Sequence, residues 1–278
     1  MKKINRRSFL AAAGLTAAAL ALTACGGSAS STASSTASSA ASSEAASTSA
    51  AAELTTVEAG KLTMATNATF PPYEMTTDSG EIEGIDVDTA KAIAEKLGLE
   101  LQIDDMDFDA ALLSVQQGKA DIVMAGVTVT DERKAVMDFS DSYATGIQSI
   151  IVPEGSDITS PDDLAGKKIG TQRGTTGYIY CSDDFGDDAV VAYDDGLTAV
   201  QALNNGQVDA VVIDNAPAKE FVAANPGLVI LDTSYAEEDY AIGLAKGSAL
   251  EDAVNAALEE LKADGTLQSI VDKYINAE

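Results

Sequence analysis

The chain has 278 residues, of which 46% are hydrophobic and 22% charged, and this suffices for one large or two small globular domains. Its formal net charge of −27 argues against nucleic acid as a partner, because phosphate contacts require clustered lysine and arginine. The chain contains no histidine, which excludes Ser-His-Asp and Cys-His catalysis and most zinc sites. An enzyme of this composition would have to use carboxylates or lysine, and we expect neither a metal nor a cofactor.

Residues 1–24 have the pattern of a lipoprotein signal peptide. Four cations within residues 2–7 precede an apolar run at 9–22 that is too short to span a membrane comfortably. Small residues then lead to Cys25, as in the lipobox of bacterial lipoproteins. We therefore expect cleavage before Cys25, lipidation of its thiol, and attachment to the extracytoplasmic face of the cell membrane through lipid alone. Residues 5–10 also resemble a twin-arginine export signal, so two export routes fit this leader.

Residues 25–59 are expected to form a disordered tether. Positions 26–52 are almost wholly Ser, Ala, Thr and Gly, a composition that cannot bury enough apolar surface to fold. About 30 flexible residues span roughly 30 Å, so the tether would hold a folded region near the membrane. With Cys25 lipidated, Cys181 is the one other cysteine, and no intramolecular disulfide is expected.

From Lys61 onward, short apolar runs alternate with amphipathic helical stretches, which predicts parallel sheets built from βαβ units. The first half of this region is predicted to contain strands at 62–67, 99–103 and 120–124, with helices at 86–97 and 108–117. The second half is predicted to contain strands at 169–171, 190–193, 209–213 and 241–245, with helices at 198–205, 249–262 and 267–274. Segments 112–125 and 200–213 run alike from helix through glycine and aspartate into an apolar strand. The chain is therefore expected to form two lobes of similar design.

The segment 120–143 is the centre of the expected binding site. An apolar strand ends in small residues and hydroxyls, which leave room for a ligand close to the backbone. Thr130 is expected to begin a helix whose third residue, Arg133, can hold both oxygens of a carboxylate. The alternative is an arginine that merely pairs with Asp131 or Asp138 on a solvated helix.

With these segments in order, residues 61–275 resemble the bacterial family 3 extracellular solute-binding proteins, which deliver polar amino acids to ABC importers. The resemblance is carried by residues 66–74, 84–88, 108–112, 128–133, 139–143 and 174–177, with Asp121 and Asp214. It implies an α/β fold of two periplasmic-binding-protein-like lobes (type II), with the ligand in the cleft between them. Lobe 1 would span 60–146 and 241–278, and lobe 2 would span 147–240. Hinge segments near 144–150 and 234–240 would let the lobes close, as periplasmic binding proteins do.

The resemblance assigns roles to single residues. Arg133 would bind the α-carboxylate of the ligand, with help from Thr128 and from backbone N–H groups near Gly126 and Thr176. Asp214 would bind the α-ammonium from the end of a strand. Gly126 stands where some members have serine, so one hydroxyl contact to the ligand would be missing.

An aromatic pair would flank the ligand. Phe70 and Phe108 match this pair, and Phe70 precedes two prolines, in a loop rather than inside an element. The full set of expected ligand-binding residues is Asn67, Phe70, Phe108, Gly126, Thr128, Arg133, Gln172, Thr175, Thr176 and Asp214.

Asn67 bears on which amino acid is bound. Several cation-binding members of the family carry an acid at its position, whereas an amide cannot neutralise a buried ammonium or guanidinium. The sequence therefore predicts a preference for an uncharged polar amino acid over lysine or arginine. Two alternatives stay open: Asn67 only shapes its turn, or Glu74, Asp107 or Asp109 supplies the missing charge.

Together these features predict a monomeric substrate-binding lipoprotein, not an enzyme, that hands a polar amino acid to the permease of an ABC importer. A dehydratase on the same fold is one alternative, since fold does not fix function. Against it, Asp214 is already required for the ammonium and no histidine can serve as acid or base. A ligand-sensing surface lipoprotein is the other alternative.

Overall fold

The structure is a computed structural model that describes residues 54–275. The expected signal peptide, Cys25 and the tether up to residue 53 lie outside the described residues. Residues 54–59, which the sequence assigns to the tether, contact the folded region instead. Leu54 packs against the core, and the Val57 N–H donates to the Asp121 carboxylate at 2.8 Å. Residues 54–59 are therefore part of the folded region that the structure describes.

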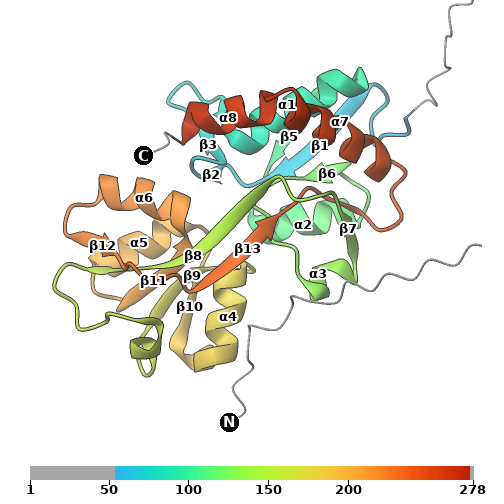
Figure 1. Cartoon of the computed structure of the whole chain (residues 1–278). Coiled ribbons are helices and arrows are strands. Elements are labelled where there is room, and N and C mark those ends of the chain that lie inside the picture. Colours follow the sequence, from blue (N-terminus) through green and yellow to red (C-terminus); the bar gives the residue numbers. More distant parts are fainter. Residues whose placement is uncertain (1–53, 276–278) are drawn as a thin grey trace, which may run out of the picture. The chain divides into compact units, whose positions relative to one another are not determined.

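Lobe 1 is built on a five-stranded sheet with the order β5-β1-β6-β14-β7 (Figure 1). Its strands are β1 (Lys61–Thr66), β5 (Glu100–Asp105), β6 (Ile122–Val123), β7 (Met137–Phe139) and β14 (Gly243–Ala245). Strand β1 is parallel to β5 and β6, whereas β14 is antiparallel to β6 and β7. The expected parallel pairing is confirmed for β1 with β5 and β6 but not for β14, which returns from lobe 2 and enters the sheet in the opposite direction.

Lobe 2 is built on a six-stranded sheet, in which β10-β9-β11-β8-β12 are neighbours and β13 pairs with β8. Its strands are β8 (Ala144–Pro153), β9 (Ile169–Gln172), β10 (Val190–Tyr193), β11 (Ala210–Asp214), β12 (Leu228–Ile230) and β13 (Ala236–Tyr240). Strand β9 is parallel to β10 and β11, and β8 is antiparallel to its partners. This sheet is therefore mixed too.

Helices pack on both sheets, as the amphipathic patterns predict. Lobe 1 carries α1 (Ile85–Leu97), α2 (Phe108–Gln116), α3 (Asp131–Lys134), α7 (Glu251–Ala263) and α8 (Thr266–Tyr274). Lobe 2 carries α4 (Thr176–Phe185), α5 (Gly196–Asn204) and α6 (Asn215–Ala224), with short 3₁₀ turns at Pro161–Leu164 and Asp187–Ala189. A small sheet of β2 (Thr69–Phe70), β3 (Glu74–Thr76) and β4 (Ile82–Glu83) precedes α1. Among the described residues, none of the helices has the length and apolar character needed to cross a membrane.

Two strands link the lobes and run side by side (Figure 1). Strands β8 and β13 are antiparallel, with Ala144 opposite Tyr240 and Gln148 opposite Ala236. Gly146 of β8 lies under the Tyr240 ring, so closely that an added Cβ would be 2.5 Å from the ring. The lobes are therefore joined by one two-stranded ribbon, and both of its strands reach the site described below.

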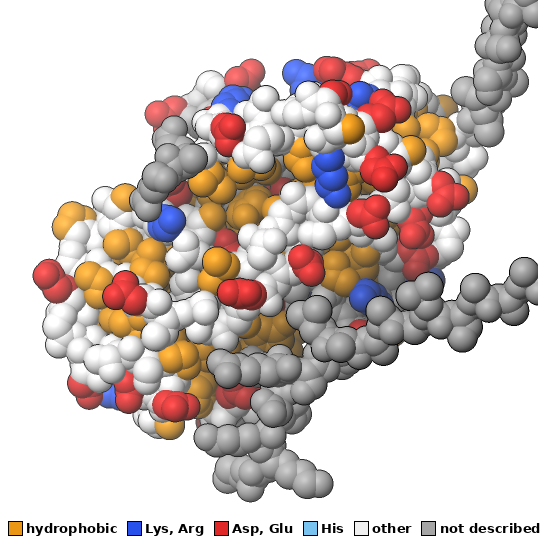
Figure 2. Space-filling view, viewed as in Figure 1, with side chains coloured by type: hydrophobic (Ala, Val, Ile, Leu, Met, Phe, Trp, Pro, Cys, Tyr) orange, Lys and Arg blue, Asp and Glu red, His pale blue; other side chains and the backbone are white. Residues whose placement is uncertain are grey.

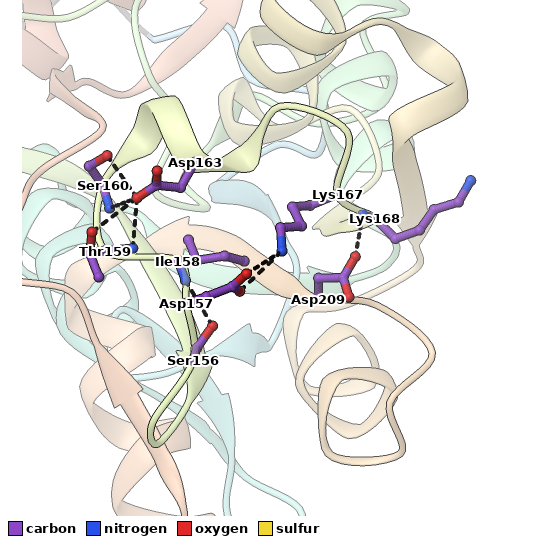
Figure 3. A network of polar contacts seen from close by, with 9 residues as sticks. All are labelled: Ser156, Asp157, Ile158, Thr159, Ser160, Asp163, Lys167, Lys168 and Asp209. Atoms are coloured by element: carbon purple, nitrogen blue, oxygen red, sulfur yellow. Dashed lines mark hydrogen bonds and ion pairs between the residues drawn. The ribbon is translucent and has the colours of Figure 1, made fainter.

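A polar network fixes the loop between β8 and β9 (Figure 3). One oxygen of Asp163 accepts from the backbone N–H and the hydroxyl of both Thr159 and Ser160, at 2.9 to 3.0 Å. These hydrogen bonds hold the pKa of Asp163 below its usual value. At the start of β9, the Asp209 carboxylate accepts from the Lys168 N–H at 2.7 Å. The network thus anchors the strand that carries Gln172 to the site.

Acidic side chains are spread over the face of the described region drawn in Figure 2, among uncharged ones. Several of the lysines are paired with them, as Lys246 is with Asp138 and Lys273 with Asp88. Such exposed pairs contribute little stability, so the acidity mainly gives a strongly solvated surface.

Candidate functional site

A small, tightly lined cavity lies between the lobes. All ten residues that the sequence assigns to ligand binding line it, from Asn67 of lobe 1 to Asp214 of lobe 2. Five further residues line it as well, namely Glu74, Ala125, Gln148, Ile213 and Tyr240. The site therefore draws on both lobes and on both linking strands.

Arg133 is held between the lobes by two backbone carbonyls. The Thr130 hydroxyl caps the short helix α3 by accepting from the Arg133 N–H at 3.2 Å, as predicted. The guanidinium donates from Nη1 to the Thr128 carbonyl at 2.8 Å and from Nη2 to the Gly174 carbonyl at 3.1 Å. Its carbon lies 5.4 Å from the centre of the Phe108 ring, a cation–π distance. The guanidinium is therefore fixed in place while N–H groups remain for an anion in the cavity that it lines.

The alternative of a solvated arginine is not observed. Arg133 is only 8% exposed, and Asp138 pairs with Lys246 at 2.6 Å instead. Burial lowers the pKa of Arg133, but an arginine side chain keeps its charge in proteins. A buried cation of this kind calls for an anion beside it, which an entering carboxylate can supply.

Asp214 ends β11 and begins α6, the strand-end position expected from the sequence. Its Oδ1 accepts from the Ala216 N–H at 3.0 Å, and its Oδ2 accepts from the Ile147 N–H at 2.7 Å. Burial raises the pKa of Asp214 to about 6, although these hydrogen bonds oppose the rise. Because a nearby cation favours the charged form, an ammonium in the cavity would find a well-oriented partner here.

Glu74 is a buried acid that lies beside another carboxyl group. It lies on β3 in the cavity wall close to Asp86, and neither of its oxygens accepts a hydrogen bond from an N–H group or an alcohol hydroxyl of the described residues. Burial, followed by the proximity of Asp86, raises the pKa of Glu74 well above its usual value. Asp86 itself accepts from the Gly126 N–H at 3.0 Å and from the Tyr143 hydroxyl at 2.7 Å. Burial and Asp86 therefore disfavour the ionised form of Glu74, and a cation beside it would favour that form.

The sequence left three acids as candidates for the missing charge: Glu74, Asp107 and Asp109. Of these three, Glu74 lines the cavity. Asp107 and Asp109 instead line a more open hollow, together with Arg173 and Asp194. The sequence could name Glu74 as a candidate, but its complete burial depends on how β3 packs against α1.

Position 126 requires a glycine, because of its backbone conformation and because the Phe70 ring lies close to it. Its φ is +55°, and an added Cβ would lie 2.8 Å from the Phe70 ring. A serine here, as in some members of the family, would be strained in this structure. The Gly126 N–H itself donates to Asp86, and the help expected for the ligand carboxylate from N–H groups near Gly126 stays a prediction.

Asn67 uses its amide within the protein. Its Oδ1 accepts from Gln172 Nε2 at 2.9 Å and from the Thr69 hydroxyl at 3.0 Å, and its Nδ2 donates to the Met106 carbonyl at 3.0 Å. The bond to Gln172 joins lobe 1 to lobe 2. Most contacts of Asn67 thus agree with the alternative that this residue shapes its turn. The contact with Gln172 also links the two lobes.

Helix α4 begins at the cavity. Thr175 caps it by accepting from the Tyr178 N–H at 3.4 Å, and Thr176 is its first residue. The Thr176 and Thr128 hydroxyls both donate to Glu238 of β13, at 2.9 and 3.1 Å. A helix N-terminus favours an anion, because its first N–H groups lack partners within the helix.

Comparison with known proteins identifies the family that shares this fold and cavity. The family described as bacterial extracellular solute-binding proteins, family 3, matches residues 62–277. The chain belongs to this family. Its members bind solutes and are not enzymes, and the family acts outside the cytoplasm.

Curated relatives and solved structures of the family cover most of the chain. The "Probable histidine-binding protein" of Neisseria gonorrhoeae is 33% identical over 283 residues, 99% of this chain and 98% of that protein. The arginine-, lysine-, histidine-binding protein ArtJ of Geobacillus stearothermophilus is 35% identical, with a TM-score of 0.75 over 78% of this chain and 96% of its own. An ancestral arginine-binding protein, solved with glutamine and with arginine, is 43% identical, with TM-scores of 0.75 and 0.74 over 78% of this chain and 99% of its own. The two-lobe fold expected for this family 3 protein is thereby confirmed.

Two site residues on the linking strands were not predicted. Gln148 lies on β8 and Tyr240 on β13, and both line the cavity. The sequence placed linking segments at 144–150 and 234–240 but did not read them as strands. In a strand, alternate residues face the same side, and this period could have indicated which of them turn inward.

Proposed function

We propose that this family 3 protein captures an α-amino acid with a cationic side chain and delivers it to the permease of an ABC importer. The observation that carries the proposal is the set of buried charges in the cavity wall, Arg133 with Asp214 and Glu74. A zwitterion with an added positive charge brings one anion and two cations. Each charge of the ligand therefore has an opposite partner in the protein.

The backbone end of the ligand lies between the lobes. Arg133 binds the α-carboxylate, since its planar guanidinium can donate to both oxygens, and the start of α4 at Thr175 and Thr176 favours the same anion. Asp214 binds the α-ammonium, whose charge shifts the Asp214 carboxyl to its ionised form.

The side chain of the ligand lies along lobe 1. Phe70 and Phe108 flank its apolar stem, and Glu74 receives the cationic end. A guanidinium can donate to both oxygens of Glu74, so arginine fits better than lysine. Two of the similar proteins support this choice, because ArtJ is described as binding arginine, lysine and histidine and the ancestral protein was solved with arginine.

This proposal replaces the expectation of an uncharged ligand. That expectation required Asn67 to face the ligand with no acid nearby, but its amide is committed to Gln172, Thr69 and Met106. Glu74 supplies the charge that Asn67 lacks.

The location and motion of the protein are proposed on the same grounds. Cleavage before Cys25 and lipidation of its thiol would anchor the protein, as a monomer, to the outer face of the membrane. Lobe 1 (60–146 and 241–278) and lobe 2 (147–240) would then close on the ligand by bending of β8 and β13.

A thermal-shift screen of the standard amino acids tests the ligand class, because a ligand that binds the native state alone raises the melting temperature. We expect the largest shift with arginine, and titration calorimetry should give one site per chain. Arg133→Ala and Asp214→Ala should each weaken binding by about 2–5 kcal/mol, as for buried charge pairs that lose one partner. Near-normal affinity in both variants would contradict the assigned roles. Lys246→Ala, which removes an exposed cation, is the matched control.

A further inference from the structure

Glu238 lies behind the cavity wall and collects donors from both lobes. It is 6% exposed and sits on β13, but it does not line the cavity. Its Oε2 accepts from the Thr176 hydroxyl at 2.9 Å, from Gln148 Nε2 at 3.0 Å and from the Thr128 hydroxyl at 3.1 Å. All three donors line the cavity. Glu238 therefore acts on the cavity through the groups that it binds.

The hydrogen bonds to Glu238 decide what the two hydroxyls can offer a ligand. A threonine hydroxyl has one proton to donate and two lone pairs that accept. The Thr128 and Thr176 hydroxyls lie 3.5 Å apart, farther from each other than either is from the charged oxygen of Glu238. Each proton therefore goes to Glu238, because a bond to an ionised acceptor is the stronger one. What remains for the cavity is lone pairs.

We propose that Glu238 is a positioning residue that turns the Thr128 and Thr176 hydroxyls into acceptors for the α-ammonium of the ligand. This assignment reverses the expectation that Thr128 helps to bind the α-carboxylate. It rests on the proposed function only in requiring that the ligand carry an ammonium and a carboxylate. Asp214 then supplies the negative charge for the ammonium, and the two hydroxyls supply further lone pairs.

Two other roles would fit the same contacts and must be separated by experiment. Glu238 could act only as a link between the lobes, since Thr128 belongs to lobe 1 and Thr176 to lobe 2. It could also act as a competing anion near Arg133, with the hydroxyls released to the ligand carboxylate. The first role predicts equal effects on every ligand, and the second predicts that removing the charge strengthens carboxylate binding.

The test uses three probes against the full-length protein by titration calorimetry, with displacement of arginine for weak ligands. They are arginine, agmatine, which keeps the ammonium but lacks the carboxylate, and 5-guanidinopentanoic acid, which keeps the carboxylate but lacks the ammonium. Glu238→Gln keeps the shape of the side chain and removes its charge. Glu237→Gln is the matched control, because Glu237 is the exposed neighbour on the same strand.

We expect Glu238→Gln to weaken arginine and agmatine by a similar factor of about 10- to 100-fold, as for the loss of a hydrogen bond to a charged group. Binding of 5-guanidinopentanoic acid should stay within about threefold, and Glu237→Gln should change none of the three. Thr128→Val should weaken arginine in the same way, and Glu238→Gln should add little in that background, because residues acting through one contact are not additive. Equal losses for all three probes, or tighter binding of 5-guanidinopentanoic acid, would overturn the proposal.

The result is independent of the side chain that the ligand carries. If the wild-type protein binds glutamine and not arginine, the cationic assignment fails, and the same series is run with glutamine, 4-aminobutanamide and glutaramic acid. The inference about Glu238 then holds if Glu238→Gln weakens only the probes that carry the ammonium, and it fails otherwise. Thr128→Val decides the question where Glu238→Gln lowers the melting temperature too far for titration.

Discussion

Replacing Glu74 by glutamine should change which amino acid the protein prefers. Glu74 is fully buried, lines the cavity, and has two carboxylate oxygens that accept no hydrogen bond from an N–H group or an alcohol hydroxyl of the described residues. A guanidinium that enters the cavity can donate to both oxygens at once, whereas the amide of glutamine offers one acceptor and places N–H groups at the other position. The variant should therefore bind arginine less tightly and leave neutral amino acids nearly unaffected.

The size of the effect follows from the number of contacts. A hydrogen bond to a charged group contributes about 1.5–3 kcal/mol. In Glu74→Gln the guanidinium keeps one hydrogen bond, to the amide oxygen, and loses the other, which should cost arginine about 1.5–3 kcal/mol, or roughly 10- to 150-fold in affinity. Binding of glutamine should change by less than about 1 kcal/mol, because it brings no second cation.

Calorimetry with arginine and glutamine on the wild-type protein, Glu74→Gln and Glu81→Gln measures this change in preference. Glu81 is exposed and precedes β4 of the same small sheet, so its substitution removes a charge without touching the cavity. The reasoning fails if Glu74→Gln weakens arginine and glutamine equally, or if Glu81→Gln has the same effect as Glu74→Gln.

Three other outcomes follow from the structure and from the leader. Burial raises the pKa of Asp214 to about 6, so affinity for the amino acid should fall as the pH drops through 6. Binding near pH 6 should then release protons, which calorimetry in buffers of different ionisation enthalpy measures. The absence of proton release would refute this prediction. Gly174→Ala should weaken ligand binding about 5- to 30-fold in titrations, because φ is +73° there and the new Cβ meets the Asp109 carboxylate. Unchanged affinity would mean that Arg133 does not depend on this closely packed loop. Cys25→Ser should release the protein from membranes in fractionation, and an equally membrane-bound variant would contradict lipid anchoring.

The sequence predicted the position of a site residue correctly where that position depends only on the neighbouring residues in the chain. Thr130 and Arg133 lie three positions apart at a strand-to-helix turn, and the cap they predict forms in the structure. Asp214 follows an apolar strand, where α/β folds place their polar groups, and it caps α6. Both readings needed only the neighbouring residues, because capping and strand ends are local features.

The features that the sequence did not reveal depend on packing between distant segments. Burial of Glu74 requires α1 to cover β3, and the antiparallel entry of β14 requires the chain to return from lobe 2. Segment 236–240 holds three acids in a row, and only its pairing with β8 turns Glu238 inward while Glu237 and Asp239 stay exposed. Burial alternates with a period of two along this strand, but the sequence Ala-Glu-Glu-Asp-Tyr has no alternation of apolar and polar residues by which to recognise it.

Contact between the lobes and binding of the ligand depend on the same groups. Arg133 donates to the Gly174 carbonyl across the lobes with one nitrogen, and its remaining N–H groups serve the cavity. Thr128 and Thr176 meet at Glu238 from opposite lobes, and their lone pairs line the same space. A ligand that binds these groups gains only when the lobes are together, because each lobe supplies half of the partners. We therefore expect closure to be favoured by any solute with an ammonium and a carboxylate at the right separation. We expect Glu74, on lobe 1 alone, to select among such solutes without being needed to close the lobes.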